Sequence, residues 1–375
     1  MDKKIVISVG VATIVVVAAI AAALILSQQG EDLNKSGTVY YVTLPPKDMK
    51  ASLAAGQIDG YIAWEPFVSD SLVGEVGTIL EWSDEIMPNH PCCVVAVSNS
   101  FAAATNGLDL TNRFVKAHVD ATIWMNNALD HPSGADYTLL VNMAVNFTQR
   151  NESVVKAAFD HIKYGTEMNS NFRSALEDFT NMYIETNMTT NASLTSRGYS
   201  SVSDFVSKYT NGTYLSGASA VAPSDTILNP TNPIRLGYLL GDLHQMAQFV
   251  AQNSSVLGTG KSMFVKYGLN VVDATGAPFA NGGAVMNAFA AGAVDIGYLG
   301  APPAILNHLG AGIGTTIIAQ ANSEGSGIVV AAGSGIVNLD GLVNKTVATP
   351  GPSSIQFLLL KIALQREGYE LKIKT

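Results

Sequence analysis

The sequence predicts an α/β protein with two lobes and a ligand cleft between them. Short segments rich in β-branched residues alternate with helical segments along most of the chain, a pattern typical of sheets covered by helices. One helix–strand–turn unit occurs twice, at residues 54–66 and 290–302, and the two copies align without a gap. A length of 375 residues with 47% hydrophobic content is sufficient for two such lobes.

The repeated unit predicts where the cleft lies. In each copy a glycine ends a helix in the left-handed C-cap position, a short strand follows, and a turn with proline comes next. Ligands of open α/β sheets bind beyond the carboxyl ends of the strands, so two copies predict two lobes that face one cleft. The alternative is that the pattern marks an ordinary helix-to-strand joint. The matching pairs are Gly56 with Gly292, Asp59 with Asp295, and Pro66 with Pro302.

Charge and cysteine content limit the partners. The formal net charge of -9, with only 14% charged residues, argues against a nucleic-acid partner, which requires a basic face. A small anionic ligand stays possible, because backbone amides at helix N-termini bind anions without Lys or Arg. Cys92 and Cys93 are adjacent and form neither a disulfide framework nor a CxxC metal site by themselves. We interpret them as two thiols on a buried strand, with a strained vicinal disulfide as the alternative, and expect no metal and no cofactor.

The N-terminal segment predicts a membrane anchor over residues 1–28. Residues 5–26 form a stretch without a charged residue. This stretch is long enough to span a bilayer and longer than the apolar region of most signal peptides. An uncleaved anchor is therefore favoured over a cleaved signal. Lys3 and Lys4 place the N-terminus in the cytoplasm and the rest of the chain outside, beyond a polar tether at 29–37. N-x-[ST] sequons are compatible with an outer surface; they start at Asn146, Asn151, Asn187, Asn191, Asn211, Asn253 and Asn344.

Residues 38–215 begin as α/β and then become helical. Strands are predicted at 39–43, 58–63 and 92–97, with a helix at 49–55 after Pro45 and Pro46 and another within 67–90. From about 100 to 214 apolar residues recur at helical spacing, which predicts a block of roughly five helices and no strand. Residues 216–233 are small, polar and rich in proline, and are predicted to form a linker.

Strands and helices alternate again after Pro233. Strands are predicted at 234–239, 270–273, 294–299, 313–320, 328–332, 346–349 and 371–374. Four turns at strand ends open helices, at 242–245, 281–283, 300–302 and 350–354. Gly300 allows the backbone to come close to a ligand beyond the strand.

Several of these stretches together resemble a known family. They are Ile234-Arg-Leu-Gly-Tyr-Leu with His244, Gly282-Gly283, Ala291-Gly-x-x-Asp-Ile-Gly-Tyr-x-Gly-x-Pro, Asn322-Ser-Glu-Gly, Lys345-Thr-Val-Ala-Thr-Pro-Gly-Pro-Ser-Ser, Leu44-Pro-Pro-x-Asp-Met49 and Trp64-Glu-Pro. As a set they resemble the nitrate/sulfonate/taurine-type substrate-binding proteins of ABC importers, over most of the chain beyond the first 35 residues. The resemblance implies a two-lobed periplasmic-binding-protein-like (type II) fold, a small-molecule solute and ABC permease subunits as partners.

The order of the segments differs from that family. There, the unit that resembles 234–375 comes first and the unit that resembles 39–214 follows, so reading residue 375 into residue 39 restores the usual order. We infer a circular permutation in which the linker at 216–233 joins the former termini. Lobe one then consists of 86–215 and 234–335, and lobe two of 38–85 and 336–375. The strands at Val39 and Leu371 are expected to be neighbours; the alternatives are a fusion of unrelated halves or an exchange between chains.

The four helix N-termini predict a binding site. Each presents free N–H groups and the positive end of a helix dipole, which suits a small oxyanion such as a sulfonate, nitrate or carboxylate. Glu65 and Glu324 instead favour an amine-bearing or heteroaromatic solute. The indole ring of Trp64 would stack on a heteroaromatic ring. The candidate ligand-binding residues are Trp64, Glu65, Asp242, His244, Gln245, Asn281, Gly282, Gly283, Gly300, Ala301, Pro302, Ser323, Glu324, Pro350, Ser353 and Ser354.

The resulting hypothesis is a membrane-tethered, extracytoplasmic receptor, expected to be monomeric, that delivers a solute to an ABC importer. The sequence contains no catalytic motif that we recognise, so no enzymatic activity is expected. One alternative is an enzyme or pyrimidine-precursor binder on the same fold, for which His90, Cys92 and Cys93 are the candidates. The other is a sensor or surface ectodomain without a role in transport.

Overall fold

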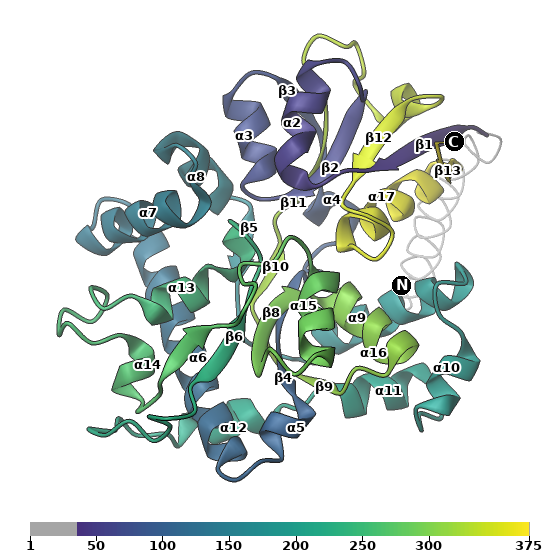
Figure 1. Cartoon of the computed structure of the whole chain (residues 1–375). Helices are drawn as coiled ribbons and strands as arrows, with labels where there is room; N and C mark the ends of the chain where they lie inside the picture. The colour runs from purple at the N-terminus through teal and green to yellow at the C-terminus, as the bar shows by residue number, and fades with distance from the viewer. Residues whose placement is uncertain (1–35, 375) are drawn as a thin grey trace, which may run out of the picture.

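The computed structural model describes residues 36–374, which form two α/β bodies, each built around one sheet (Figure 1). The first sheet has six strands in the order β13-β1-β12-β2-β11-β3 and the second has five in the order β7-β6-β8-β4-β9. The strands of the first are β13 (Glu370–Ile373), β1 (Thr38–Thr43), β12 (Thr346–Thr349), β2 (Gly60–Trp64), β11 (Ser326–Ala331) and β3 (Gly77–Trp82); those of the second are β7 (Val271–Asp273), β6 (Ile234–Gly237), β8 (Ile296–Gly300), β4 (Cys93–Ser98) and β9 (Thr315–Gln320).

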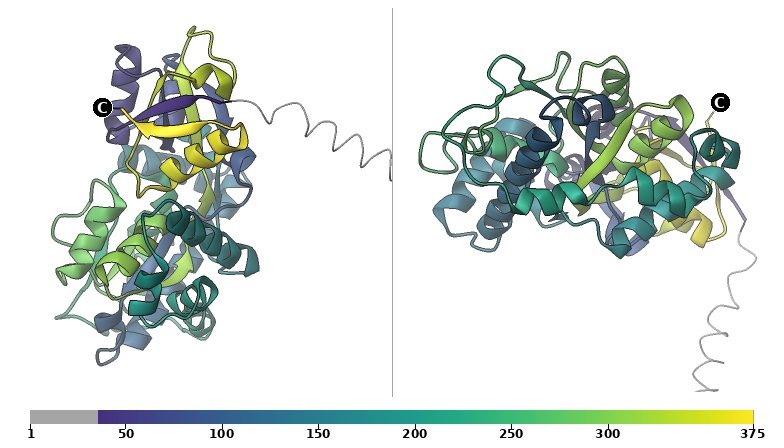
Figure 2. Two further views of the ribbon diagram at one scale, coloured as in Figure 1. Left: turned by 90° about the vertical axis from the view of Figure 1, so that its right-hand side faces the viewer. Right: turned by 90° about the horizontal axis from the view of Figure 1, so that it is seen from below.

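The first and last strands of the described chain are neighbours in the six-stranded sheet. β1 lies between β12 and β13 and is parallel to both, with Val39 opposite Leu371 and Tyr41 opposite Ile373. Figure 2 shows these two strands side by side, one purple and one yellow. The prediction that the strands at Val39 and Leu371 pair is therefore confirmed.

Helices cover the six-stranded sheet because its central strands are apolar on both faces. All five residues of β2 are buried. The covering helices are α2 (Pro46–Ala54), α3 (Phe67–Val73) and α17 (Ile355–Arg366), and Met49 and Leu359 are fully buried. β2 pairs parallel with β12 and antiparallel with β11, and it is buried on both faces because helices cover both sides of this mixed sheet.

The repeated unit has the same local structure in both sheets. Asp59 precedes β2, and its carboxylate accepts the N–H of Thr346 at the start of the adjacent strand at 2.8 Å. Asp295 precedes β8 in the same way and accepts the N–H of Arg235 at 2.9 Å. In each copy the aspartate N–H also donates back to that strand, so the aspartates fix the register of a parallel pair.

The helical block contains more elements than predicted. Within the described chain, residues 99–219 form eight helices rather than five, and a short strand, β5 (Ile162–Tyr164), which the sequence analysis did not predict. The helices are α5 (Asn99–Ala102), α6 (Gly107–Leu129), α7 (Ala135–Thr148), α8 (Glu152–Phe159), α9 (Ser170–Glu185), α10 (Asn191–Ser196), α11 (Val202–Tyr209) and α12 (Thr213–Ser219). α12 also takes the first residues of the predicted linker, so only the part after Ser219 is free of helix and strand.

Two further expectations about strands were wrong. β3 was not predicted, because it is a half-buried edge strand without a clear alternation of apolar and polar residues. β11, which we assigned to lobe one as part of 234–335, pairs with β2 and β3 in the six-stranded sheet. A short apolar run is equally compatible with either sheet, so its pattern does not specify its partners.

Two segments connect the bodies. One runs from β3 through α4 (Ser83–Ile86) to β4, and the other is β10 (Asn322–Glu324), which pairs antiparallel with β5 before the chain enters β11. Between these elements Lys163 and Glu324 form an ion pair at 2.9 Å. Both connections pass beside the cleft described below, so the bodies are joined at its base.

None of the helices within residues 36–374 is long and apolar enough to cross a membrane. The anchor predicted over 1–28 and nearly all of the tether predicted over 29–37 lie outside the described residues.

The two aspartates of the repeated unit should differ in their effect on stability. We expect Asp295→Ala to lower the free energy of unfolding by about 1–3 kcal/mol, because it leaves a strand N–H and Arg235 without their buried acceptor. Asp59→Ala, whose side chain is 37% exposed, should cost less than about 1 kcal/mol because water replaces the carboxylate. Urea unfolding of both variants measures this, and equal losses would contradict the assigned difference in burial.

Candidate ligand-binding cleft

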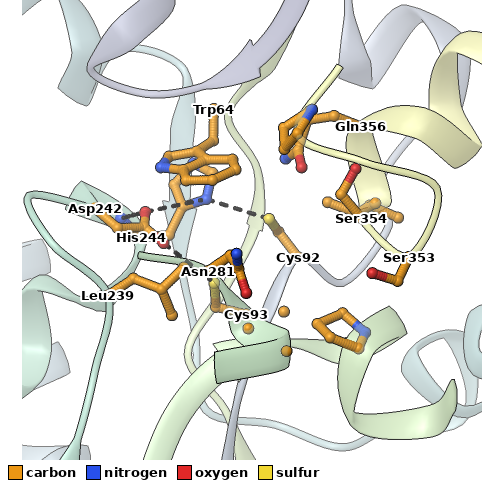
Figure 3. Close-up of a pocket in the computed structure, with 16 residues that line it drawn as sticks. Trp64, Cys92, Cys93, Leu239, Asp242, His244, Asn281, Ser353, Ser354 and Gln356 are labelled. Atoms are coloured by element: carbon orange, nitrogen blue, oxygen red, sulfur yellow. Dashed lines mark hydrogen bonds and ion pairs between the residues drawn. The ribbon is translucent and has the colours of Figure 1, made fainter. Parts of the chain in front are cut away.

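A cavity of about 110 Å³ lies between the two bodies, on the scale of several water molecules. It forms where strands of both sheets end: β2 leads into Trp64, β12 into Pro350, β6 into Leu239 and β8 into Gly300. Figure 3 shows Trp64, His244 and Asp242 on one side of it and Ser353, Ser354 and Gln356 on the other. The lining residues are Trp64, Cys92, Cys93, Leu239, Asp242, His244, Asn281, Gly282, Gly283, Gly300, Pro303, Pro350, Ser353, Ser354, Ile355 and Gln356.

Ten of the sixteen candidate binding residues line this cavity. They come from all four predicted turns and from Trp64. The turn residues therefore converge as predicted. Trp64 and residues 350–356 come from the body with the six-stranded sheet, and residues 239–303 come from the body with the five-stranded sheet.

Three of the helix starts are capped by their own side chains. Asn281 accepts the N–H of Ala284 at the start of α15 (Gly282–Ala290), and Ser354 accepts the N–H of Phe357 in α17. Asp242 accepts the N–H of His244 at the 3-10 turn η1 (Leu243–Gln245), which leads into α13 (Met246–Gln252). The first N–H groups of α15 and α17 have no acceptor within their own helices. They belong to residues that line the cavity, namely Gly282, Gly283, Ile355 and Gln356.

The fourth helix start offers no such donors, and this part of the prediction was wrong. α16 (Ala301–Ala311) begins with Ala301, whose N–H donates to the carbonyl oxygen of Cys92 at 2.8 Å. Pro302 and Pro303 have no N–H. Gly300 and Pro303 still line the cavity, so this terminus contributes surface rather than hydrogen-bond donors.

Six candidate residues do not line the cavity. Ala301 and Pro302 are buried in the first turn of α16. Gln245 is buried and bonds to the N–H of Leu239, and Ser323 accepts from Gln320. The two glutamates expected in the cleft are also engaged elsewhere: Glu65 with Ser69, and Glu324 with Lys163 and the N–H of Asn89.

Glu65 is fully buried behind the cleft, and its carboxyl accepts both the N–H and the hydroxyl of Ser69. Burial raises the pKa of Glu65 to about 7, because the low-dielectric surroundings disfavour the charged form. Asp242 does line the cavity, and burial raises its pKa to about 6. The acidic group that a solute meets is therefore Asp242 rather than a glutamate.

The two cysteines and His244 form a cluster that the sequence analysis did not predict. Both cysteines are free and buried, Cys93 at the start of β4 and Cys92 just before it, in agreement with two thiols at a buried strand. Sγ of Cys92 lies 3.2 Å from Nδ1 of His244. Hydrogen bonding from Cys93, together with the imidazole, holds the pKa of Cys92 well below its ordinary value despite burial. Burial lowers the pKa of His244, but the charges of Cys92 and Asp242 outweigh it and raise the pKa to about 9.

Trp64 separates the cavity from a second one of about 300 Å³, whose lining also includes Phe67, Phe147 and Leu240. The side chain is 7% exposed, and its Nε1 finds no hydrogen-bond partner within residues 36–374. A buried N–H without an acceptor is costly, so this donor favours an occupant that carries an acceptor. Arg150, at the edge of the second cavity, forms an ion pair with Asp70 of the other body at 2.8 Å.

The additional lining residues are Cys92, Cys93, Leu239, Pro303, Ile355 and Gln356. Pro303, Ile355 and Gln356 follow predicted turns and could have been included with those turns. The cysteines carried no such signal, because they are 152 and 151 positions before His244 and match no motif.

Comparisons with known proteins add two family matches. Residues 5–137 match the model described as the NMT1-like family, and residues 272–374 match the model described as an ABC transporter, phosphonate, periplasmic substrate-binding protein. The bicarbonate transport ATP-binding protein CmpC of Synechocystis sp. is 36% identical over 73 residues, which are 20% of this chain and 11% of that protein. The similarity thus spans about a ninth of that relative. No solved structure matches the chain.

A two-lobed α/β fold with a cleft at the strand ends defines a class of binding proteins. The two family matches confirm the resemblance to ABC-importer substrate-binding proteins of the NMT1, nitrate/sulfonate type. They support a solute-binding receptor for an ABC importer, and neither family is one of enzymes.

The raised pKa of Glu65 predicts a pH-dependent stability. Because the pKa of Glu65 is higher in the folded state, its contribution to the free energy of unfolding is full below about pH 4.5. This contribution is lost as pH rises through about 7. Glu65→Gln stays neutral and should remove this loss, about 3 kcal/mol between pH 4.5 and 9. Urea unfolding over this pH range measures it. The control Glu167→Gln, at an exposed side chain, should keep the wild-type profile; an unchanged profile for Glu65→Gln would contradict the assignment.

Proposed function

We propose that this protein is an extracytoplasmic receptor that captures a small solute between its two bodies and delivers it to an ABC importer. The observation that carries the proposal is the convergence of capped helix N-termini from both bodies, with Trp64, on one cavity. Closure of the two bodies on a solute would remove it from water and strengthen these contacts.

The lining favours a small polar or anionic solute that carries hydrogen-bond acceptors. Donors come from the first N–H groups of α15 and α17 and from the Ser353 hydroxyl. We propose the unpartnered Nε1 of Trp64, a residue that lines this cavity and the second one, as a further donor. No Lys or Arg is among the lining residues that the structure describes, so a strongly charged anion would depend on dipoles and His244 for compensation. Sulfonates, nitrate, bicarbonate and zwitterions are the classes that fit these donors.

Delivery requires a permease and an orientation at the membrane. The second family model describes a periplasmic protein, which supports an extracytoplasmic location for the described part. We propose that residues 1–28 anchor the protein, that it acts as a monomer without enzymatic activity, and that ABC permease subunits are its partners. The bicarbonate transport protein with local similarity supports the same setting.

We also propose that the chain is circularly permuted relative to its family, with lobe one from 86–215 and 234–335 and lobe two from 38–85 and 336–375, apart from β11. The pairing of β1 with β13 supports this proposal. A sheet completed by both ends of the described chain is what a cut inside one lobe would leave.

A second candidate function, an enzyme on the same fold, is favoured by one observation. Sγ of Cys92 lies 3.2 Å from Nδ1 of His244, so a thiol nucleophile and a base are within reach of each other, and the carbonyl oxygen of Gly325 orients the imidazole through Nε2. An enzyme would convert the solute that it binds, whereas a receptor would release it unchanged.

Binding is tested by thermal unfolding of the full chain with sulfonates, nitrate, bicarbonate, amino acids and pyrimidines. We expect at least one to raise Tm and to be recovered unchanged by mass spectrometry. Trp64→Phe should weaken that solute about threefold to tenfold, the equivalent of one hydrogen bond, because only the unpartnered N–H is lost from the cleft.

The matched control is Trp82→Phe, whose indole stacks on His161 and does not line the cavity. It should bind the solute as the unsubstituted chain does. A folded protein whose Tm responds to none of these solutes would overturn the receptor proposal, and a chemically altered solute would favour the enzyme.

A further inference from the structure

We propose that Cys92, Cys93 and His244 form a binding site for a thiophilic divalent cation of the Zn²⁺ class, with one coordination position open to the cleft. The two Sγ atoms and a ring nitrogen of His244 all lie within 4.8 Å of one another, and all three side chains are at most 3% exposed. Tetrahedral coordination with Zn–S and Zn–N bonds of about 2.3 and 2.0 Å places ligand atoms about 3.5–3.8 Å apart, so atoms no more than 4.8 Å apart can converge on one ion through small side-chain shifts.

The backbone holds the two cysteines in place. The N–H of Cys92 donates to the carbonyl oxygen of Asn322 at 3.1 Å, and the N–H of Cys93 donates to the side chain of the same residue at 2.9 Å. Ala301 and Ala321 donate to the two cysteine carbonyl oxygens. Four hydrogen bonds from two segments thus fix this dipeptide, so the two ligands are already ordered in the fold.

The orientation of His244 is that of a metal ligand. Its Nε2 lies 2.9 Å from the carbonyl oxygen of Gly325, which can only accept, so Nε2 carries a hydrogen and Nδ1 faces the cysteines. Ligating histidines are typically fixed in this way, by a hydrogen bond from the second ring nitrogen to a carbonyl or carboxylate. Gly325 has a φ of +81°, and a Cβ at this position would collide with the imidazole, so the contact requires glycine.

Charge and ligand type select the cation. Two thiolates and one neutral imidazole cancel the charge of a divalent ion, which leaves a neutral complex in a buried place. Sulfur and imidazole ligands favour zinc-like ions and disfavour Mg²⁺ and Ca²⁺, which require oxygen. Binding would release to water the protons that the two thiols and the imidazole hold between them, because the ligands are two thiolates and a neutral imidazole.

The site opens on the cavity. Cys92, Cys93 and His244 all line it, and Figure 3 shows Cys92 between His244 and the start of α17. Three protein ligands with a free fourth position characterise zinc sites that accept an exogenous ligand, whereas structural sites are closed by four. A bound cation would offer a solute donor atom one open coordination position in the cleft. The metal site does not depend on the proposed function, because it can be tested without a solute.

The test is a titration of the reduced full chain with Co²⁺ in the absence of air and of solute. We expect one Co²⁺ per chain, with a thiolate-to-cobalt charge-transfer band in the near ultraviolet and tetrahedral d–d bands in the visible, both removed by Zn²⁺. Cys92→Ser and Cys93→Ser should each reduce the charge-transfer band, and His244→Gln should weaken binding at least about tenfold.

The control is His90→Gln, which removes the other buried imidazole near the cysteines but no ligand, and should bind Co²⁺ as before. A second readout on the unsubstituted chain covers the case in which a variant fails to fold. Zn²⁺ should slow alkylation of both cysteines by iodoacetamide, and Mg²⁺ should not. No charge-transfer band, or equal alkylation rates with and without Zn²⁺, would overturn the metal site.

Discussion

The structure depends on the hydrogen bonding of β1 on both of its edges. One edge bonds to β12 and the other to β13, so both partners come from the last thirty residues of the chain. The N–H of Tyr40 donates to Lys345, that of Leu44 to Thr349, and that of Lys374 to Tyr41. Without these bonds the strand that follows the N-terminal segment would have unpaired backbone groups on both sides.

This pairing also places the cleft. Once β1, β12 and β2 are aligned in parallel, the segments that leave β12 and β2 emerge at one end of the sheet, where Pro350 and Trp64 lie. The second sheet ends in the same way at Leu239 and Gly300, opposite the first. The cleft is therefore a consequence of strand direction in two sheets, and the polar side chains at the strand ends become its walls.

The sequence predicted much of this arrangement and missed parts of it for identifiable reasons. The helix starts at Asn281 and Ser354 were predicted correctly because capping is local: a polar side chain, a helical segment and a preceding strand suffice. The neighbouring ends of the chain were predicted through resemblance, since periodicity carries no information about which strands pair. β11 was assigned to the wrong sheet, because its apolar run is compatible with either one.

The cluster of Cys92, Cys93 and His244 depends on geometry that no local pattern contains. Its members come from a connection between the bodies and from a turn at the end of β6. The bonds of Asn322 to the cysteines and of Gly325 to the imidazole, which fix their relative orientation, all join residues far apart in the sequence. The prediction that Glu65 and Glu324 line the cleft was wrong, because it rested on residue type alone. Ser69 binds the carboxyl of Glu65 and Lys163 binds that of Glu324, and neither glutamate lines the cavity.

The position of β13 has a consequence for synthesis on the ribosome. Every strand of the five-stranded sheet lies between Cys93 and Gln320, so that sheet can be complete while the end of the chain is still inside the exit tunnel. The six-stranded sheet cannot, because β13 at its edge is translated after every other strand of the described residues. Both edges of β1 therefore stay without their partners until residues 346–373 have been translated.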